Sequence, residues 1–335
     1  MSDLIGICGQ VRGLAPKLLS SAQVDRMIGA GTAQEAFRVL TELQYADYLD
    51  QSTELSDFDR IISQGLQETR DLLVSGAGDH PGLDFLWLSF DLNNLKRALK
   101  AKLLEGATDL ANFNEDDSYS TLGRVSASDL QRLVFEGKPS GPLPYQLLEA
   151  VAQAPQLAGK EGDFRAVEFA LDKAYFEHLN AVVTELQDDF MSDFFTFMVN
   201  VTQARNIARS VLTMSEAIPE NGWLPFGHLS YEKAGKVSTY EDLARALRLT
   251  ELGGVLANVN DNDSAAAKML KIEEGLDHAY YQFLETAATG SLDSPAVLIN
   301  YFTQRLRNAR VLKLIMYGKL NGVSNDKIYQ LIQTA

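Results

Sequence analysis

Apolar residues recur at helical spacing along most of this chain, and no other feature constrains its fold as strongly. From Phe164 to Leu179 they form one stripe, whereas most charged residues of that segment fall on the other faces of a helix. Ser294 and Pro295 are a cap and a first helical residue, and they open a second long stripe that ends before Asn321. Period-two alternation between hairpin turns is nowhere convincing. The spacing therefore predicts an all-α chain, with loops where glycine and proline collect, among them residues 155–162.

Three sequence patterns recur in the same order, which indicates internal repetition. The first places an arginine between apolar residues at 24–28, 130–134 and 243–247. The second and sharper pattern matches 167–176 to 272–281, and its counterpart near Phe58 is degraded. The third joins an amide to a base two residues later: Asn94 with Lys96, Gln203 with Arg205, and Asn308 with Arg310.

Together these patterns predict three similar helical-bundle domains of roughly 110 residues each. We place them at 1–125, 126–236 and 237–335. Such copies, arranged around an axis or in an arc, would form a shaped scaffold with a concave side. The alternative is chance, because helical chains of any kind share patterns this degenerate.

Charge and composition exclude several classes of partner. The chain has 30 Lys and Arg residues against 45 Asp and Glu, a formal net charge of −15 that repels phosphate backbones, so we expect no nucleic-acid partner. The one cysteine, Cys8, cannot form an internal disulfide and suits a reducing compartment such as the cytoplasm. The densest apolar run, Phe194–Val199, is far shorter than the roughly 20 residues that cross a bilayer. We therefore expect neither a targeting segment nor a membrane span.

Catalytic motifs are not found in the sequence. No Gly-Lys pair is followed by Ser or Thr, as a phosphate-binding loop requires. The four histidines lack the spacing of metal ligands, and the acidic runs Asp188-Asp189 and Glu115–Asp117 are more typical of solvated surfaces than of a site. We expect no catalytic residue, no cofactor and no metal.

Positive charge is concentrated in residues 294–335. This stretch has six basic residues and one acid, so it carries +5 while the rest of the chain carries −20. Arg307, Arg310 and Lys313 are three apart and form a basic stripe on one helix face. Either this stripe pairs with acidic helices of the same chain, or it is a surface that binds a partner.

Several blocks of sequence carry a family resemblance. They are Val11–Gly13 with Lys17–Ser20 and Phe37–Tyr45, then Phe90–Lys96, Glu168–Phe176, and Asn308–Leu314 with Gly318–Val323. In this order they resemble the C subunit of prokaryotic V/A-type (vacuolar/archaeal-type) rotary ATPases, the relative of the d subunit in the eukaryotic vacuolar enzyme. The similarity extends over essentially the whole chain. Asn200, Arg305 and Arg307 depart from the family pattern, which usually has acidic residues there.

The resemblance implies a non-catalytic central-stalk component of an ion-translocating ATPase or ATP synthase. Such proteins are funnels of three helical domains with pseudo-threefold symmetry, peripheral to the membrane on its cytoplasmic face. They receive the shaft formed by the D and F subunits and sit on the membrane rotor ring of c/K-type proteolipids, which links ATP turnover to H+ or Na+ transport. Our candidate partner-contact or structural repeat positions are Asp91, Asn94, Lys96, Gln203, Arg205, Arg307, Asn308, Arg310 and Lys313.

Two other classes of protein fit the same sequence. An α-helical adaptor unrelated to rotary ATPases would share the composition and the repeats, but would bind neither a shaft nor a ring. A helical hydrolase with a carboxylate-bound metal would need acids and histidines that converge on one pocket, and it is the less favoured of the two.

Overall fold

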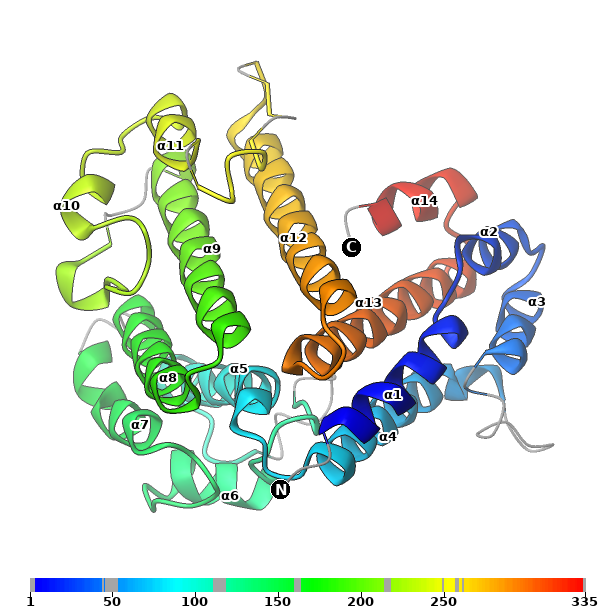
Figure 1. The fold of residues 1–335 in the computed structure, drawn as a ribbon, viewed down its shortest axis with the longest axis horizontal. Coiled ribbons are helices and arrows are strands. Elements are labelled where there is room, and N and C mark those ends of the chain that lie inside the picture. The colour runs from blue at the N-terminus through cyan, green and yellow to red at the C-terminus, as the bar shows by residue number, and fades with distance from the viewer. Residues whose placement is uncertain are drawn as a thin grey trace. The chain divides into compact units, whose positions relative to one another are not determined.

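Every regular element that the structure describes is helical, which confirms the all-α prediction for that part of the chain (Figure 1). The structure is a computed structural model that describes residues 4–43, 45, 54–110, 119–159, 164–213, 218–248, 250–256, 259–260 and 262–333. Contacts divide the chain into two compact units. We call Met1–Asp79 with Tyr280–Ala335 the split unit, and His80–Ala279 the central unit. The three predicted repeats divide the chain at other residues than these two units, and they stay a prediction.

The split unit joins the two ends of the chain around a pair of long helices that pack on each other, α4 and α13 (Figure 1). Its helices are α1 (Leu4–Leu14), α2 (Ser21–Gly29), α3 (Ala33–Arg38), α4 (Phe58–Ala77), α13 (Pro295–Leu320) and α14 (Asn325–Gln333). Both α4 and α13 bury apolar side chains at helical spacing. Ile61 and Leu73 of α4 and Phe302 and Leu312 of α13 are fully buried. Each contributes about 1.5–3 kcal/mol of burial free energy.

The central unit is built around α8, which packs along α7 and also contacts α5 and α9. Its helices are α5 (Asp84–Leu104), α6 (Ala127–Leu130), α7 (Tyr145–Ala158), α8 (Phe164–Leu186), α9 (Asp189–Thr213), α10 (Tyr231–Ala234) and α11 (Tyr240–Leu247). The apolar stripe predicted from Phe164 is buried here, with Val167, Leu171 and Leu179 fully inaccessible. Another helix, α12 (Ala265–Gly290), begins in the central unit and ends in the split unit.

The loop expected at 155–162 begins later than predicted, because α7 continues through Pro155 to Ala158. A proline removes one backbone donor and crowds the preceding turn. Pro155 therefore cannot donate to the Val151 carbonyl four residues earlier, and α7 ends three residues after it. Gly159 follows the helix with a φ of 58°, a positive value that glycine adopts without the clash of a Cβ.

The apolar run Phe194–Val199 forms part of α9, where four of its six side chains are buried in the central unit. Among the helices that the structure describes, none combines the length and the apolar content needed to cross a bilayer.

Candidate functional site

The amide residues predicted from the sequence lie on long helices. Their side chains bind backbone atoms of loops, and each loop leads into a short helix. On α5, the carboxylate of Asp91 is fully buried and accepts the backbone N–H groups of Arg124 and Val125, each at 3.0 Å. Asn94 binds Ser120 twice, because Nδ2 donates to the carbonyl and Oδ1 accepts the N–H, both at 2.9 Å. A Cβ on Gly123 would overlap the Asp91 carboxylate. We call this arrangement the first junction.

The second junction repeats this construction on α9. The Oδ1 atom of Asn200 accepts the backbone N–H of His228 at 2.8 Å. Gln203 donates from Nε2 to the carbonyls of Leu224, at 2.7 Å, and Leu229, at 3.3 Å. Gly227 again allows the close approach, since a Cβ there would lie 2.5 Å from Gln203 Oε1. Asn200 and Gln203 occupy the same two positions, three residues apart, as Asp91 and Asn94.

The third junction lies in the split unit and uses Asn308 of α13. With the amide oriented to satisfy both neighbours, its Oδ1 accepts the backbone N–H of Leu19 at 2.8 Å, and its Nδ2 donates to the Gln304 carbonyl at 3.3 Å. Arg305 stands three residues earlier, where the other junctions have Asp91 and Asn200. A guanidinium has no acceptor, so Arg305 cannot hold the N–H groups of a loop as those residues do.

Arg305 turns instead toward α4. It is only 3% exposed; its Nε donates to Thr69 Oγ1 at 3.2 Å, and a terminal nitrogen donates to the Gly65 carbonyl at 3.3 Å. The guanidinium carbon lies 5.3 Å from the ring centre of Tyr45, a cation–π distance. Burial raises the pKa of the Tyr45 hydroxyl, and the charge of Arg305 opposes that shift.

At each junction a serine caps the short helix that follows. Ser20, Ser126 and Ser230 accept the backbone N–H three residues later, at 3.3, 3.1 and 3.3 Å, and begin α2, α6 and α10. A serine cap of this kind is worth about 1 kcal/mol to its helix. In the second of these caps, hydrogen bonds from the Ser140 and Ser126 hydroxyls lower the pKa of Asp129.

Two of the three predicted bases pair with acidic residues on a neighbouring long helix. Lys96 Nζ lies 2.5 Å from Asp172 on α8, and Arg205 lies 2.6 Å from Glu273 and 3.6 Å from Asp277 on α12. Asp172 and Asp277 are matched positions of the second sequence pattern. Because these side chains are about a quarter to a half exposed, each pair contributes at most about 1 kcal/mol.

The sequence left two alternatives for the basic stripe on α13, which are pairing with acids of the same chain or contact with a partner. Lys313 Nζ lies 2.9 Å from Asp59 of α4, so this residue pairs with the chain's own acid. Arg307 is exposed and lies over the ring of Tyr281, at 4.7 Å from its centre, and Arg310 is also exposed. Contact of Arg307 or Arg310 with a partner stays a prediction.

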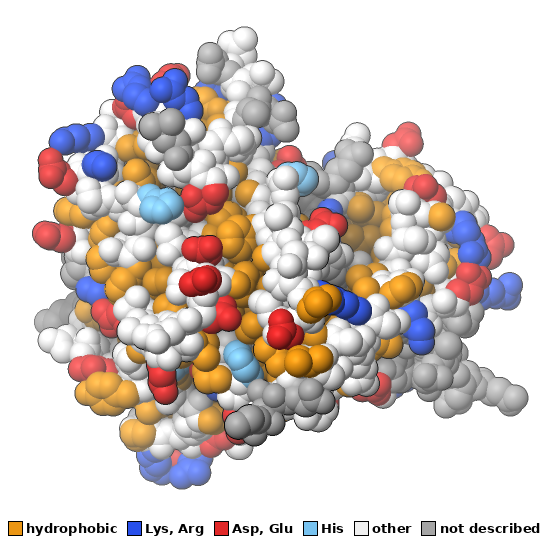
Figure 2. Space-filling model, in the orientation of Figure 1, with side chains coloured by type: hydrophobic (Ala, Val, Ile, Leu, Met, Phe, Trp, Pro, Cys, Tyr) orange, Lys and Arg blue, Asp and Glu red, His pale blue; other side chains and the backbone are white. Residues whose placement is uncertain are grey.

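Among the described residues, no group of three or more His, Cys, Asp or Glu side chains is placed so that it could hold a metal ion. The acidic run Glu115–Asp117 lies outside the described residues. His178 Nε2 lies 3.1 Å from Asp84, which is also 2.5 Å from Arg124, and this group ties α8 and α5 to the loop of the first junction. In the central unit, Figure 2 shows acidic side chains in the region of α9, and side chains of both signs around α10 and α11.

The sequence interpretation missed part of each junction. Asn200 was noted only as a departure from the family pattern, and Gly123 and Gly227 were not singled out. A usable signal was present, because both glycines stand three residues before a capping serine, as Gly-x-x-Ser. The first two matches of the arginine pattern, at 24–28 and 130–134, lie on or directly after the serine-capped helices α2 and α6. The third match, at 243–247, lies on α11 and not on the serine-capped helix α10.

Comparison with known proteins identifies a family whose sequences this chain matches. A family model described as ATP synthase (C/AC39) subunit matches residues 7–331, a range that includes all three junctions. The C subunit of a V-type ATP synthase from Deinococcus radiodurans is 22% identical over 97% of this chain and 89% of its own length. The C subunit of an A-type ATP synthase from Methanocaldococcus jannaschii is 20% identical over 96% of this chain and 84% of its own length. Its A-type counterpart from Haloquadratum walsbyi is 24% identical over 49% of this chain and 48% of its own.

Proposed function

Since the chain belongs to the ATP synthase (C/AC39) subunit family, we propose that it is the socket joining the shaft of a V/A-type rotary ATPase to its membrane rotor ring. As the C subunit of such an enzyme it is a non-catalytic component of the central stalk. The observation that carries this conclusion is the family match from residue 7 to residue 331. ATP turnover takes place in other subunits, and this chain transmits torque.

The three junctions support a body made of three similar helical domains, at 1–125, 126–236 and 237–335. In each case a long helix carries a polar side chain that binds a loop, and the loop leads into a serine-capped short helix. Repetition of this chemistry is what copies of one unit would give. In the first and second junctions the loop follows the long helix, and in the third the loop and α2 come from the other end of the chain. Three such copies around an axis would produce the pseudo-threefold funnel of the family.

Torque transmission requires a body that resists deformation, and the junctions supply local stiffness. Buried polar groups are costly unless all of them are paired, so a paired cluster strongly favours one arrangement of its neighbours. Asp91 and Asn94 fix the loop of the first junction through backbone atoms, which leaves the loop few other conformations. The partners of this body would be the D and F shaft subunits, and the c/K-type proteolipid ring on the cytoplasmic face of the membrane.

A pull-down with a purified D–F complex tests the proposal. The isolated chain should show no ATPase activity and should bind D–F at moderate salt, with the axis of its three domains over the shaft. The measurement is the amount of D–F complex retained on the immobilised chain, with circular dichroism as the control for folding. A clean negative with well-folded proteins would contradict the proposal.

The Arg310→Glu variant tests whether the basic stripe reaches a partner. We expect its affinity for the D–F complex or the ring to fall about tenfold or more, which is about 1.4 kcal/mol, while Tm stays unchanged. Arg310 is exposed, and Lys313 of the same stripe lies 2.9 Å from Asp59 of α4. Lys327→Glu, an equal charge change at an exposed position of α14, is the matched control. Loss of folding in Arg310→Glu would instead indicate that the stripe serves internal pairing.

A further inference from the structure

Ion pairs join α9 to α12 within the central unit. Glu273 of α12 accepts hydrogen bonds from both arginines of α9, from Arg205 Nε at 2.6 Å and from a terminal nitrogen of Arg209 at 2.9 Å. Arg205 also lies 3.6 Å from Asp277, about one turn further along α12. Because Glu273 binds both arginines, the cluster depends on this acid more than on any other of its members.

Apolar packing contributes little to the same joint. α12 packs closely against none of the other helices that the structure describes, whereas α8 packs along α7 and on α5. In the part of α12 that belongs to the central unit, residues 265–279, only Ile272 and Leu276 are buried. A backbone segment lies against this part of α12, since a Cβ on Gly275 would be 2.5 Å from the Val255 carbonyl oxygen. The direct contact between α9 and α12 therefore depends on charge.

The corresponding joint between α5 and α8 is built differently. Lys96 of α5 also pairs with an acid of the neighbouring helix, Asp172, but α5 and α8 pack on each other directly as well. Tyr175 of α8 is buried, whereas Tyr280, the matching residue of α12 in the second sequence pattern, is only half-buried. Loss of the ion pair would thus leave the packing of α5 on α8 in place, and α9 and α12 have no such packing.

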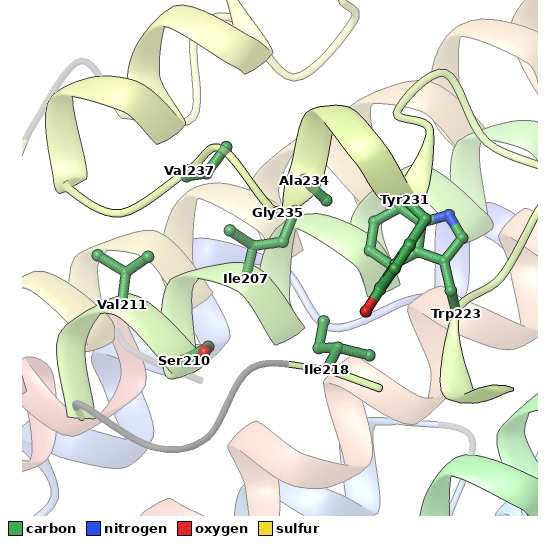
Figure 3. Close-up of a pocket in the computed structure, with 9 residues that line it drawn as sticks. All are labelled: Ile207, Ser210, Val211, Ile218, Trp223, Tyr231, Ala234, Gly235 and Val237. Carbon is green, nitrogen blue, oxygen red and sulfur yellow. The ribbon is translucent and has the colours of Figure 1, made fainter. Parts of the chain in front are cut away.

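The face of α9 that points away from the two arginines is not fully packed either (Figure 3). A pocket of about 90 Å³ lies between the last turns of α9 and the end of α10, and Ile207 and Val211 line it. At about 100° per residue, these two positions lie opposite Arg205 and Arg209 on the helix. The last turns of α9 thus have a void on one face and ion pairs on the other, so the ion pairs matter more to their position.

The ion pairs are accessible to water and salt. The side chains of Arg205 and Glu273 are 29% and 26% exposed, and those of Arg209 and Asp277 are 58% and 47% exposed. Pairs between such charges are weak, and at 1 M ionic strength the screening length falls to about 3 Å. A joint held in this way can open under conditions that leave buried apolar contacts intact.

We propose that Arg205, Arg209, Glu273 and Asp277 form an ionic latch. When it is closed it holds α12 beside α9, and when it opens α12 separates from α9 while the rest of the central unit stays folded. Since α12 continues beyond Ala279 into the split unit, the latch acts on one of the two chain connections between the units. The inference concerns this chain alone and does not depend on the proposed function.

The Glu273→Gln variant tests the latch, because it removes the shared acid and keeps the size of the side chain. Nitroxide labels on cysteines introduced at exposed Thr213 of α9 and Leu270 of α12 report the separation of the two helices by double electron–electron resonance on the intact chain. The native Cys8 is buried. We expect the mean separation to increase by about 3 Å or more, since bonds through water replace the direct hydrogen bonds.

Asp172→Asn is the matched control, with labels at exposed Lys100 of α5 and Glu168 of α8. Its label separation should equal that of the wild-type chain, because the packing of α5 on α8 remains. An unchanged separation of α9 and α12 in Glu273→Gln would overturn the proposal. So would an equal increase at both joints, which would indicate general loosening and not a latch.

Salt provides a second measurement that does not depend on the folding of Glu273→Gln. In the chain with native ion pairs, an increase from about 0.1 M to about 1 M NaCl should widen the Thr213–Leu270 separation and leave the Lys100–Glu168 separation unchanged. A Thr213–Leu270 separation that does not respond to salt would overturn the latch and leave the proposed function intact. The pull-down with D–F tests that function separately.

Discussion

The Asp91→Ala variant should lose about 3 kcal/mol of unfolding free energy and about 4–7 °C of Tm. The reason is the first junction, where the Asp91 carboxylate accepts the N–H groups of Arg124 and Val125 away from solvent. Truncation leaves those donors without an acceptor. Urea denaturation measures the loss, and hydrogen exchange at residues 124 and 125 should accelerate with it.

Asp91→Asn is the matched control, because the second junction uses an asparagine, Asn200, at the same position. One amide oxygen can still accept an N–H of the loop, so we expect a loss of about 1–2 kcal/mol, well short of that of the alanine variant. If Asp91→Ala and wild type unfold at the same urea concentration, the junction contributes nothing to stability and our account of it is wrong.

The Arg305→Ala variant should lose about 3 kcal/mol, for a different physical reason. Arg305 fills space between α13 and α4, and its guanidinium satisfies Thr69 Oγ1 and the Gly65 carbonyl. Alanine leaves a cavity beside Tyr45 and removes both donors. Differential scanning calorimetry of the intact chain would measure the change.

Arg305→Met separates the two causes, since methionine restores most of the volume without the charge. Exchange of a buried charged group for an apolar one of similar size is often close to neutral. We therefore expect Arg305→Met to recover at least half of the loss seen in Arg305→Ala. Equal losses in the two variants would mean that the hydrogen bonds, and not packing, account for the role of Arg305.

The helices were predictable from sequence because each depends on local signals. The stripe from Phe164 is the buried face of α8, and the Ser294-Pro295 signal begins α13 through a serine hydroxyl that accepts the Ala296 N–H. Pro155 misled because a proline usually ends a helix, whereas α7 continues for three residues beyond it despite the missing N–H.

The junctions were only half predictable. The amide–base pattern singled out Asn94, Gln203 and Asn308. The atoms that they bind belong to loops 21 to 289 residues away along the chain: Ser120, Leu224 and Leu19 are examples. A backbone acceptor or donor leaves no mark in the sequence. Only the glycine that permits the close approach does, and it was overlooked at both Gly123 and Gly227.

The split unit is formed by the first and last segments of the chain, and this affects how the protein folds during synthesis on the ribosome. α4 is made early, but the helix that covers it, α13, follows only after His80–Ala279 have been translated. At about 5–20 residues per second that delay is roughly 10–40 s for about 200 residues. Throughout it, the face of α4 that packs on α13 stays uncovered, although α1 can already pack on α4, while the central unit can close as it emerges. Nascent chains of this protein are therefore most vulnerable to aggregation at their N-terminal helices, where a chaperone would be needed before assembly begins.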